Sequence, residues 1–495
     1  MATKYQNFIN GKWVDAKSGE TFENRNPANW NELVGTFPKS GKEDVDEAVR
    51  AARKAYDLWR LVPAPERAEI MKKAGDIMVS RKREISELMT REMGKVLAET
   101  MGDMQEGIDT AYYAHGEGRR LFGKTVPSEL RNKFAMAVRI PIGVAGMITP
   151  WNFPMAIPTW KIFPALLCGN TVVFKPASDT PATATEFIKI LLEAGVPPGA
   201  VNIVHGGGGA VGNAIVEHPD VNMIGFTGST EIGKKISASA AQTLKRVSLE
   251  LGGKNAQIVM NDADLKLALD GVLWGAFGTT GQRCTATSRL LVHEKVYDTF
   301  IADLIDRTKK LKLGDGLKEG IEVGPLVNEG QQKSVHEYVE IGQKEGAKLV
   351  TGGDKATGDG LNDGWFYQPT IFTDVTPEMR IAKEEIFGPV LSIIKIKSLE
   401  DGIKTLNNTI YGLSSSIYTQ DVNNAFKAMR DIEAGITYIN GPTIGAECHM
   451  PFGGVKETGN GHREGGWGAY EFYSEWKTLY VDFSGKLQRA QIDNY

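Results

Sequence analysis

Apolar residues recur with a helical period through residues 44–122, as in the segments "DVDEAVRAARKAYDLW" and "ERAEIMKKAGDIMVSRKREISELM". Apolar positions three and four residues apart form one face of an amphipathic helix. The pattern therefore predicts a layer of helices early in the chain.

From about Val138 the pattern changes to short apolar runs separated by helical segments. The runs are "VAGMIT", "TVVFKP", "VNIVHG", "MIGFTG" and "RVSLEL". Alternation of buried strands with helices predicts a parallel sheet that is covered on both faces. A second alternating series follows "LELGGKNAQIVMNDAD", so we expect two α/β domains with a junction near Gly253.

The uncharged segment from Pro141 to Trp160 is long enough to span a bilayer. It contains four prolines and Asn152, which would interrupt the backbone hydrogen bonds of a spanning helix. We therefore expect buried structure in a soluble globular protein here. The first residues lack the apolar core of a signal peptide, so no export is expected.

Composition narrows the partners and the compartment. A chain of 495 residues exceeds one ordinary hydrophobic core, and a net charge of -4 gives no general attraction to nucleic acid or to a membrane surface. Neither is expected as a partner. The three cysteines, Cys168, Cys284 and Cys448, form no CxxC pair, and their odd number favours a reducing compartment, by default the cytoplasm.

Two glycine-containing stretches are candidates for binding phosphate. "HGGGGAVG" contains a G-x-G-x-x-G pattern that begins at Gly207, but a flexible turn between strand and helix gives the same pattern about half the time. In "FTGSTEIGKK" a strand ends at Gly228 and Ser229 opens a helix, so backbone N–H groups and the helix dipole suit a pyrophosphate. A plain N-cap is the alternative.

Two polar residues lie in surroundings that suit catalysis. Glu250 ends the apolar run "RVSLEL", and a carboxylate in apolar surroundings has a raised pKa that suits a general base. An ion pair with Lys254 is the alternative at even odds. Asn152 lies in "TPWNFP", where a rigidly presented amide can donate to an oxyanion, although an Asn in such a stretch is more often part of an ordinary turn.

Cys284 lies in "GQRCTATSR", among small and polar residues. A free cysteine is most often a small core residue. Here the neighbours are not a periodic apolar run, and Arg283 is predicted to favour the thiolate. No Cys/His ligand cluster is present in the sequence, so no metal site is expected. A cysteine-dependent hydrolase with His449 as its base stays open.

Taken in order, seven blocks resemble the NAD(P)-dependent aldehyde dehydrogenase superfamily closely: "TPWNFP", "VVFKPASDTP", "FTGSTEIG", "LELGGK", "GQRCTATSR", "EEIFGPV" and "PFGGVKETGNG". The resemblance covers nearly the whole chain. It implies two doubly wound α/β domains and a small β oligomerisation arm, and a homodimer or homotetramer. The cofactor domain would comprise residues 1–121 and 142–253, the catalytic domain 254–460, and the arm 122–141 with 470–495.

The same resemblance assigns catalytic roles. Cys284 would attack an aldehyde, and the Asn152 side chain and the Cys284 backbone N–H would hold the oxyanion. Hydride transfer to the nicotinamide leaves a thioester, which a water activated by Glu250 would hydrolyse to the carboxylic acid. A non-catalytic protein with this fold would be expected to lose the thiol or the glutamate, and both are present.

The implied cofactor is NAD or NADP, and the G-x-G-x-x-G pattern becomes largely a decoy. Ser178 stands where many NAD-preferring members carry glutamate, so we expect use of NADP+ as well as NAD+. The implied cofactor-binding residues are Thr149, Trp151, Lys175, Ser178, Gly228, Ser229, Glu385 and Phe387.

For the substrate, Arg283 precedes the nucleophile, and a guanidinium can hold a carboxylate with two charged hydrogen bonds. A carboxylated semialdehyde, such as that of a 2-oxo acid, is therefore favoured. If Arg283 instead pairs with a structural carboxylate, a broad-specificity aliphatic or aromatic aldehyde dehydrogenase is expected. The implied substrate-binding residues are Arg283, Phe153, Trp160, Thr285, His449 and Phe452.

Overall fold

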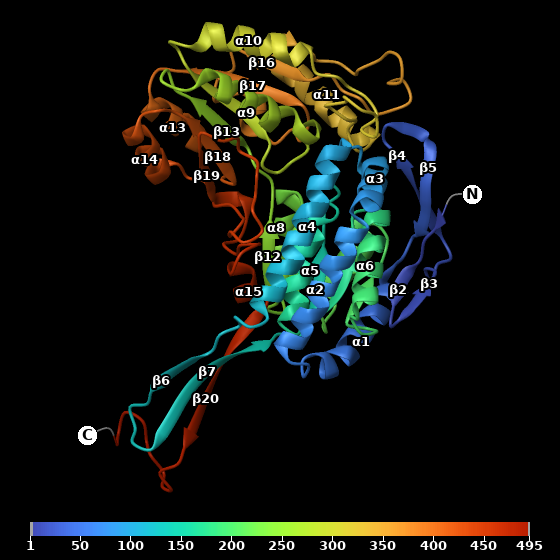
Figure 1. The fold of residues 1–495 in the computed structure, drawn as a ribbon, viewed down its shortest axis with the longest axis vertical. Coiled ribbons are helices and arrows are strands. Elements are labelled where there is room, and N and C mark those ends of the chain that lie inside the picture. Colours follow the sequence, from blue (N-terminus) through green and yellow to red (C-terminus); the bar gives the residue numbers. More distant parts are fainter. Residues whose placement is uncertain (1–2, 494–495) are drawn as a thin grey trace.

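A computed structural model describes residues 3–493 of the chain. Within them, two seven-stranded sheets and two three-stranded sheets are present. Figure 1 shows two bodies of sheet and helix stacked along the long axis, with a narrow β arm projecting from the lower one. The predicted fold class, two α/β units plus a β arm, is confirmed.

The first large sheet is parallel over five strands and ends in an antiparallel hairpin. In spatial order the strands are β12 (Arg246–Glu250), β11 (Met223–Thr227), β8 (Val144–Ile148), β9 (Thr171–Lys175), β10 (Val201–Ile203), β2 (Asn7–Ile9) and β3 (Lys12–Val14). The five parallel strands are the five apolar runs of the sequence. They are buried on both faces, as parallel strands under helices require.

Helices cover this sheet, and the predicted early helical layer is present (Figure 1). The helices are α1 (Lys42–Trp59), α2 (Ala64–Ser80), α3 (Lys82–Met93), α4 (Leu97–Glu117), α5 (Ala156–Leu167), α6 (Pro181–Ala194), α7 (Asn213–Glu217) and α8 (Thr230–Ala241). Apolar side chains of α2, α4 and α5 share one core with β8 and β9. This packing gives α4 a fixed face toward the site described below.

The segment 141–160 forms the end of a strand, all of β8, a loop and the start of α5. Its residues from position 144 on are largely buried, as expected for this proline-containing apolar stretch. Within residues 3–493, no helix combines the length and the apolar character needed to cross a membrane.

The second large sheet is parallel except at one edge, where β15 pairs antiparallel with β16. In spatial order its strands are β15 (Lys348–Thr351), β16 (Thr370–Thr373), β17 (Val390–Ile396), β14 (Thr287–His293), β13 (Asn255–Val259), β18 (Ser414–Tyr418) and β19 (Ile436–Ile439). Its helices are α9 (Leu265–Phe277), α10 (Tyr297–Lys309), α11 (Glu329–Lys344), α12 (Arg380–Lys383), α13 (Leu399–Asn407) and α14 (Val422–Asp431).

The chain passes from the first large sheet to the second between Glu250 and Asn255. The linker is the "LGGK" of the block "LELGGK", so the residues of that block lie between the two bodies. The domain limits given above stay a prediction. A further small sheet contains β1 (Thr3–Lys4), β5 (Asn29–Pro38) and β4 (Thr21–Asn26).

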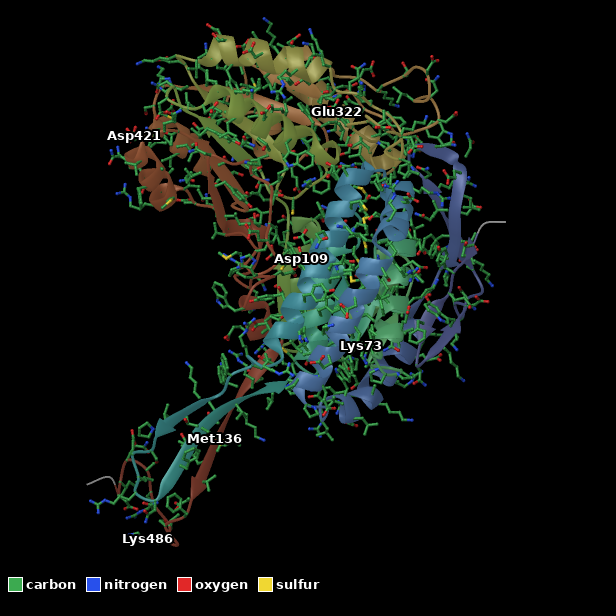
Figure 2. All side chains as sticks on the ribbon, viewed as in Figure 1. Lys73, Asp109, Met136, Glu322, Asp421 and Lys486 are labelled. Carbon is green, nitrogen blue, oxygen red and sulfur yellow. The ribbon has the colours of Figure 1, made fainter. Side chains whose placement is uncertain are left out.

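The arm is the antiparallel sheet of β20 (Ser474–Asp482), β7 (Lys133–Pro141) and β6 (Lys124–Pro127). In Figure 2, Met136 lies along the arm and Lys486 at its tip. The short helix α15 (Gly468–Phe472) precedes β20 and packs against α5. Five large apolar side chains on the strands of the arm are exposed in this chain: Val126, Phe134, Trp476, Tyr480 and Val481.

Candidate active site

A cavity of about 620 Å³ lies where α4, α5, the end of β12 and the loop before β14 meet. Glu250 and Cys284 both line it. Phe153, Trp160, Arg283, Thr285 and Phe452, all predicted to bind substrate, line it as well. Residues from widely separated blocks of the sequence therefore meet around one space.

The backbone before Cys284 is held in an unusual turn. Thr279, Thr280 and Gly281 have φ of 53°, 57° and 68°, in the left-handed region. A Cβ atom at Gly281 would lie 2.1 Å from the carbonyl oxygen of Gly388, so only glycine fits. On the other side, the Asn255 Nδ2 donates to the carbonyl oxygen of Cys284 at 2.7 Å. The nucleophile candidate is thus anchored through its backbone.

The two glycines of "LELGGK" allow three blocks to meet. A Cβ atom at Gly252 would lie 2.4 Å from Glu385 Oε2, and one at Gly253 would lie 2.5 Å from the carbonyl oxygen of Cys284. The N–H of Gly253 also donates to Glu385 Oε1 at 2.9 Å. The glycines are therefore required by the close approach of Glu385 and Cys284, and not by a turn alone.

The surroundings of Cys284 favour the protonated thiol. Burial, followed by the carboxyl groups of Glu385 and Glu250, raises its pKa to about 12, and the N–H groups of Thr285 and Cys284 itself oppose the shift. The prediction that Arg283 favours the thiolate is wrong. Its guanidinium donates instead to Thr279 Oγ1 at 2.8 Å and pairs with Glu99 at 3.2 Å.

Glu250 is buried at the end of β12, and neither of its oxygens has a hydrogen-bond partner among the described residues. Burial raises its pKa well above the ordinary value, Glu464 adds to the shift, and Lys161 and Arg463 oppose it. The alternative of an ion pair with Lys254 is not observed, since Lys254 Nζ also lacks a partner in residues 3–493.

A buried ion pair lies beside this carboxyl group. Lys161 of α5 pairs with Glu464, and both side chains are almost fully buried. Their charges act on Glu250 in opposite directions, so Glu250 keeps a raised pKa without a direct partner. A buried carboxyl group without a fixed hydrogen bond can turn toward a water molecule, as a general base must.

Asn152 is buried in the loop before α5, and it is not among the residues that line the cavity. Its Nδ2 donates to the carbonyl oxygen of Gln282 at 3.2 Å, two residues before the thiol. The amide therefore reaches the loop of the nucleophile but is engaged by that loop's backbone. Asn152 Nδ2 can exchange this hydrogen bond for one to a substrate oxyanion.

The first part of the candidate cofactor site lies at the carboxyl ends of β8 and β9. Thr149 N–H donates to the carbonyl oxygen of Lys175 at 3.3 Å. Burial lowers the pKa of Lys175 to about 8, and Asp179 opposes this shift. Ser178 Oγ donates to the carbonyl oxygen of Gly206 at 3.3 Å. A lysine, a hydroxyl group and backbone groups thus surround one edge of the sheet.

The second part is the start of α8. Ser229 is its N-cap, and its Oγ accepts from the N–H of Ile232 at 3.4 Å. At Gly228, a Cβ atom would lie 2.5 Å from the Phe226 ring. Nearby, Trp151 and Phe387 are in edge-to-face contact with ring centroids 5.4 Å apart. Helix N–H groups, Lys175 and the carboxyl group of Glu385 form a donor and acceptor set that fits a dinucleotide.

The G-x-G-x-x-G loop has a different character. It forms a single π-helical turn, Gly208–Gly212, followed by α7. The residues 207–210 are exposed, and a Cβ atom at Gly207, Gly208 or Gly209 would meet no atom within 4 Å. Among residues 3–493, none therefore requires glycine at these three positions by close approach.

A family model described as the aldehyde dehydrogenase family matches residues 13–479. The chain belongs to this family. It is an oxidoreductase that oxidises aldehydes to carboxylic acids with NAD or NADP. This confirms the resemblance, the enzyme class and the cofactor class.

Individual proteins agree with this assignment. The alpha-ketoglutaric semialdehyde dehydrogenase of Bacillus subtilis (strain 168) is 44% identical over 96% of this chain and 98% of its own. Aldehyde dehydrogenase 1A1 of Homo sapiens is 44% identical over 97% and 95%. The crystal structure of an NAD-dependent aldehyde dehydrogenase from Sinorhizobium meliloti superposes with a TM-score of 0.95, at 38% identity, over 99% and 97%.

The hydrolase alternative finds no support in this geometry. His449 is not among the cavity-lining residues; its half-exposed ring lies 3.4 Å from Glu447. Among the described residues, no histidine lines the cavity that holds Cys284. Across the same part of the chain, no group of three or more His, Cys, Asp or Glu side chains is arranged to hold a metal ion.

Sequence reasoning missed the polar side of the cavity. Glu99, Asp103 and Glu106 line it from one face of α4, and Glu464 lines it from the C-terminal part of the chain. The spacing of the three α4 residues, four and three apart, is a signal that marks one helix face. Glu464 and its partner Lys161 carry no such signal.

Proposed function

We propose that Cys284 is the nucleophile, that Glu250 is the general base, and that Asn152 donates to the oxyanion. The observation that carries this is the meeting of Cys284 and a partner-free, buried Glu250 at one cavity. The Asn152 amide lies beside the same loop.

The thiol must lose its proton before it can attack, because its pKa is raised to about 12. Glu250 is our candidate to accept that proton, since it lines the same cavity, its charge acts on the Cys284 pKa, and its oxygens have no hydrogen-bond partner among the described residues. The sulfur then bonds to the aldehyde carbon, and the carbonyl oxygen becomes an oxyanion that Asn152 Nδ2 and the Cys284 N–H hold. The bound nicotinamide supplies the acceptor for the hydride of this adduct.

The resulting thioester on Cys284 needs one water molecule. Glu250 accepts a proton from that water, the water oxygen bonds to the acyl carbon, and the carbon–sulfur bond breaks. The products are the carboxylic acid and the free thiol. The raised pKa of Glu250 places this base closer to neutral pH than an ordinary glutamate.

For the cofactor, we assign Ser229 and Gly228 to the pyrophosphate, Lys175 and Ser178 to the adenosine side, and Glu385 to the nicotinamide ribose. Trp151, Phe387 and Thr149 border the same site. Ser178 offers no negative charge to repel a 2′-phosphate, which supports use of both NAD+ and NADP+. The neighbouring Asp179 is the residue that could restore discrimination: burial raises its pKa, and the hydrogen bond that it accepts from Asn328 at 2.8 Å opposes this shift.

The activity is tested by the absorbance of reduced nicotinamide with an aldehyde and NAD+ or NADP+. The wild type is expected to turn over, and the Cys284→Ser variant to bind cofactor normally without measurable oxidation, because an alcohol is a far weaker nucleophile. A serine variant that keeps more than a few per cent of the turnover contradicts the assignment.

For the substrate, we infer a carboxylated semialdehyde, such as that of a 2-oxo acid. Arg283 lines the cavity beside the nucleophile, and its recorded hydrogen bonds use Nε and Nη2. That leaves Nη1 without a partner among the described residues. The name of the Bacillus subtilis relative points to the same class of substrate.

A broad-specificity aliphatic or aromatic aldehyde dehydrogenase is the second candidate. The cavity wall is largely apolar, with Trp160 and Phe452 in contact at 4.8 Å between centroids. The guanidinium of Arg283 is also stacked near Trp274, at 4.9 Å, as a structural cation would be. The human relative is also 44% identical, and its name does not mention a semialdehyde.

The variant Arg283→Leu separates the two. If Arg283 binds the carboxylate, kcat/KM for a carboxylated semialdehyde falls about 10- to 100-fold, while an uncharged aldehyde of equal length is little affected. Because Glu99 would lose its partner, the same comparison is made in Arg283→Leu with Glu99→Gln. Equal losses for both aldehydes in both backgrounds reject the role.

We further propose a homodimer or homotetramer in the cytoplasm. The exposed apolar side chains of the arm, among them Phe134 and Tyr480, support burial against another copy. The three cysteines are unpaired, which supports a reducing compartment. Sedimentation velocity tests the assembly: Phe134→Ser should shift it toward a smaller species.

A further inference from the structure

The carboxyl group of Glu106 has no role in the mechanism proposed above. Glu106 lines the cavity from α4, seven residues or about 10 Å along the helix from Glu99. The other two carboxylates of this face are neutralised: Glu99 pairs with Arg283 at 3.2 Å, and Asp103 with Lys95 at 2.7 Å. Glu106 Oε1 is buried without a hydrogen-bond partner among the described residues.

The surroundings of Glu106 favour its neutral form. Burial is the main cause that raises the pKa of Glu106 to about 8. Asp103 and Asp109 also raise this pKa, and Arg283 and Lys95 lower it. Its charge also acts on two groups that do not line the cavity, Tyr438 of β19 and Cys448. The apolar walls contributed by Phe153, Trp160 and Phe452 add no compensating charge.

A neutral carboxyl group has one O–H to donate, and an unsatisfied buried donor is costly. A second donor of the wall is in the same position, since Trp160 Nε1 has no hydrogen-bond partner within residues 3–493. An indole N–H can only donate. A ligand that satisfies both groups must carry acceptor oxygens away from its aldehyde end.

We propose that Glu106, in its protonated form, donates a hydrogen bond to the distal carboxylate or oxo oxygen of the substrate and so determines specificity together with Arg283. This rests on the proposed function and deepens it. A carboxylic acid kept neutral in an apolar site is an effective donor to a developing or full negative charge. When it ionises, the same group repels the carboxylate.

The proposal predicts a pH-dependent selectivity. The measured quantity is the ratio of kcat/KM for a carboxylated semialdehyde to kcat/KM for an uncharged aldehyde of equal length, between about pH 6.5 and about pH 9.5. Protonation of Cys284 and Glu250 affects both substrates and cancels in this ratio. In the wild type the ratio falls about 10-fold or more as pH rises through the pKa of Glu106.

Three variants complete the test. Glu106→Gln keeps an amide donor at every pH, so its ratio stays high and varies less than about twofold. Glu106→Leu lacks a donor, so its ratio at low pH is about 10- to 100-fold below the wild type and falls no further. Asp109→Asn removes the same charge from an exposed position of the same helix and retains the wild-type fall in the ratio, with its midpoint at slightly lower pH because Asp109 raises the pKa of Glu106.

The outcomes separate this inference from the substrate proposal. A high ratio that is independent of pH and unchanged in Glu106→Gln overturns the role of Glu106 and leaves the substrate proposal standing. A ratio at or below one at every pH overturns both. A third outcome is that the enzyme prefers an ω-aminoaldehyde increasingly as pH rises and that Glu106→Gln loses this preference. That result shows that an ionised Glu106 binds a cation, and it overturns the donor role.

Discussion

Replacement of Gly252 by alanine should weaken cofactor binding without touching the cofactor. The added Cβ atom would lie 2.4 Å from Glu385 Oε2, about 1 Å closer than ordinary contact at 3.4 Å. The obstacle is the end of a side chain, so Glu385 can move and the backbone need not. A displacement of this size breaks the 2.9 Å hydrogen bond from the Gly253 N–H to Oε1.

The expected magnitude follows from the contact that is lost. If Glu385 accepts from the nicotinamide ribose, its displacement removes a hydrogen bond to a charged group, about 1.5–3 kcal/mol. This corresponds to about a 10- to 150-fold increase in the Kd of NAD+. Since Cys284 and Glu250 stay in place, kcat at saturating cofactor should change much less than kcat/KM.

The matched control is Gly209→Ala, in the G-x-G-x-x-G loop, where an added Cβ atom meets nothing within 4 Å. Isothermal titration with NAD+ compares both variants with the wild type, and a thermal melt checks that each is folded. We expect Gly209→Ala to bind within about twofold of the wild type. Weakened binding in Gly209→Ala together with normal binding in Gly252→Ala would refute the placement of the cofactor.

Three further variants test other parts of the site. Glu250→Gln should give one equivalent of reduced cofactor and then stall, and steady turnover would exclude Glu250 as the general base. Because the pKa of Glu250 is raised, the wild-type kcat should rise with pH as Glu250 ionises, and this variant should lack that rise. Ser178→Glu should reduce kcat/KM for NADP+ at least about 10-fold with little effect on NAD+, measured by initial rates. Lys161→Met should lower the free energy of unfolding, measured by urea denaturation, by about 3–5 kcal/mol, because Glu464 would keep an unpaired buried charge. The double variant Lys161→Met with Glu464→Gln should recover most of the lost stability.

The sheets were predictable because their signals are local: five apolar runs became five parallel strands. The candidate catalytic residues came from the resemblance of the blocks "LELGGK" and "GQRC" to a family, and their catalytic roles stay a proposal, although Glu250 and Cys284 do line one cavity. The partners of charged side chains were not predictable. Arg283 pairs with Glu99, 184 residues away, and Lys161 with Glu464, 303 residues away, and neither pair leaves a periodic pattern.

This difference has a physical basis that bears on the substrate. Gly252 and Gly281 are fixed by atoms about 2 Å from a missing Cβ, so a change at Gly281 disturbs the nucleophile loop and a change at Gly252 displaces Glu385. Glu106 projects from the middle of α4, and its replacement leaves the hydrogen bonds of the helix backbone intact. The proposed chemistry therefore depends on positions that tolerate little change, while the proposed selectivity depends on a side chain, Glu106, that the backbone does not constrain. For this reason the sequence blocks identify the reaction, and only measurements on side chains such as Glu106 and Arg283 can identify the aldehyde.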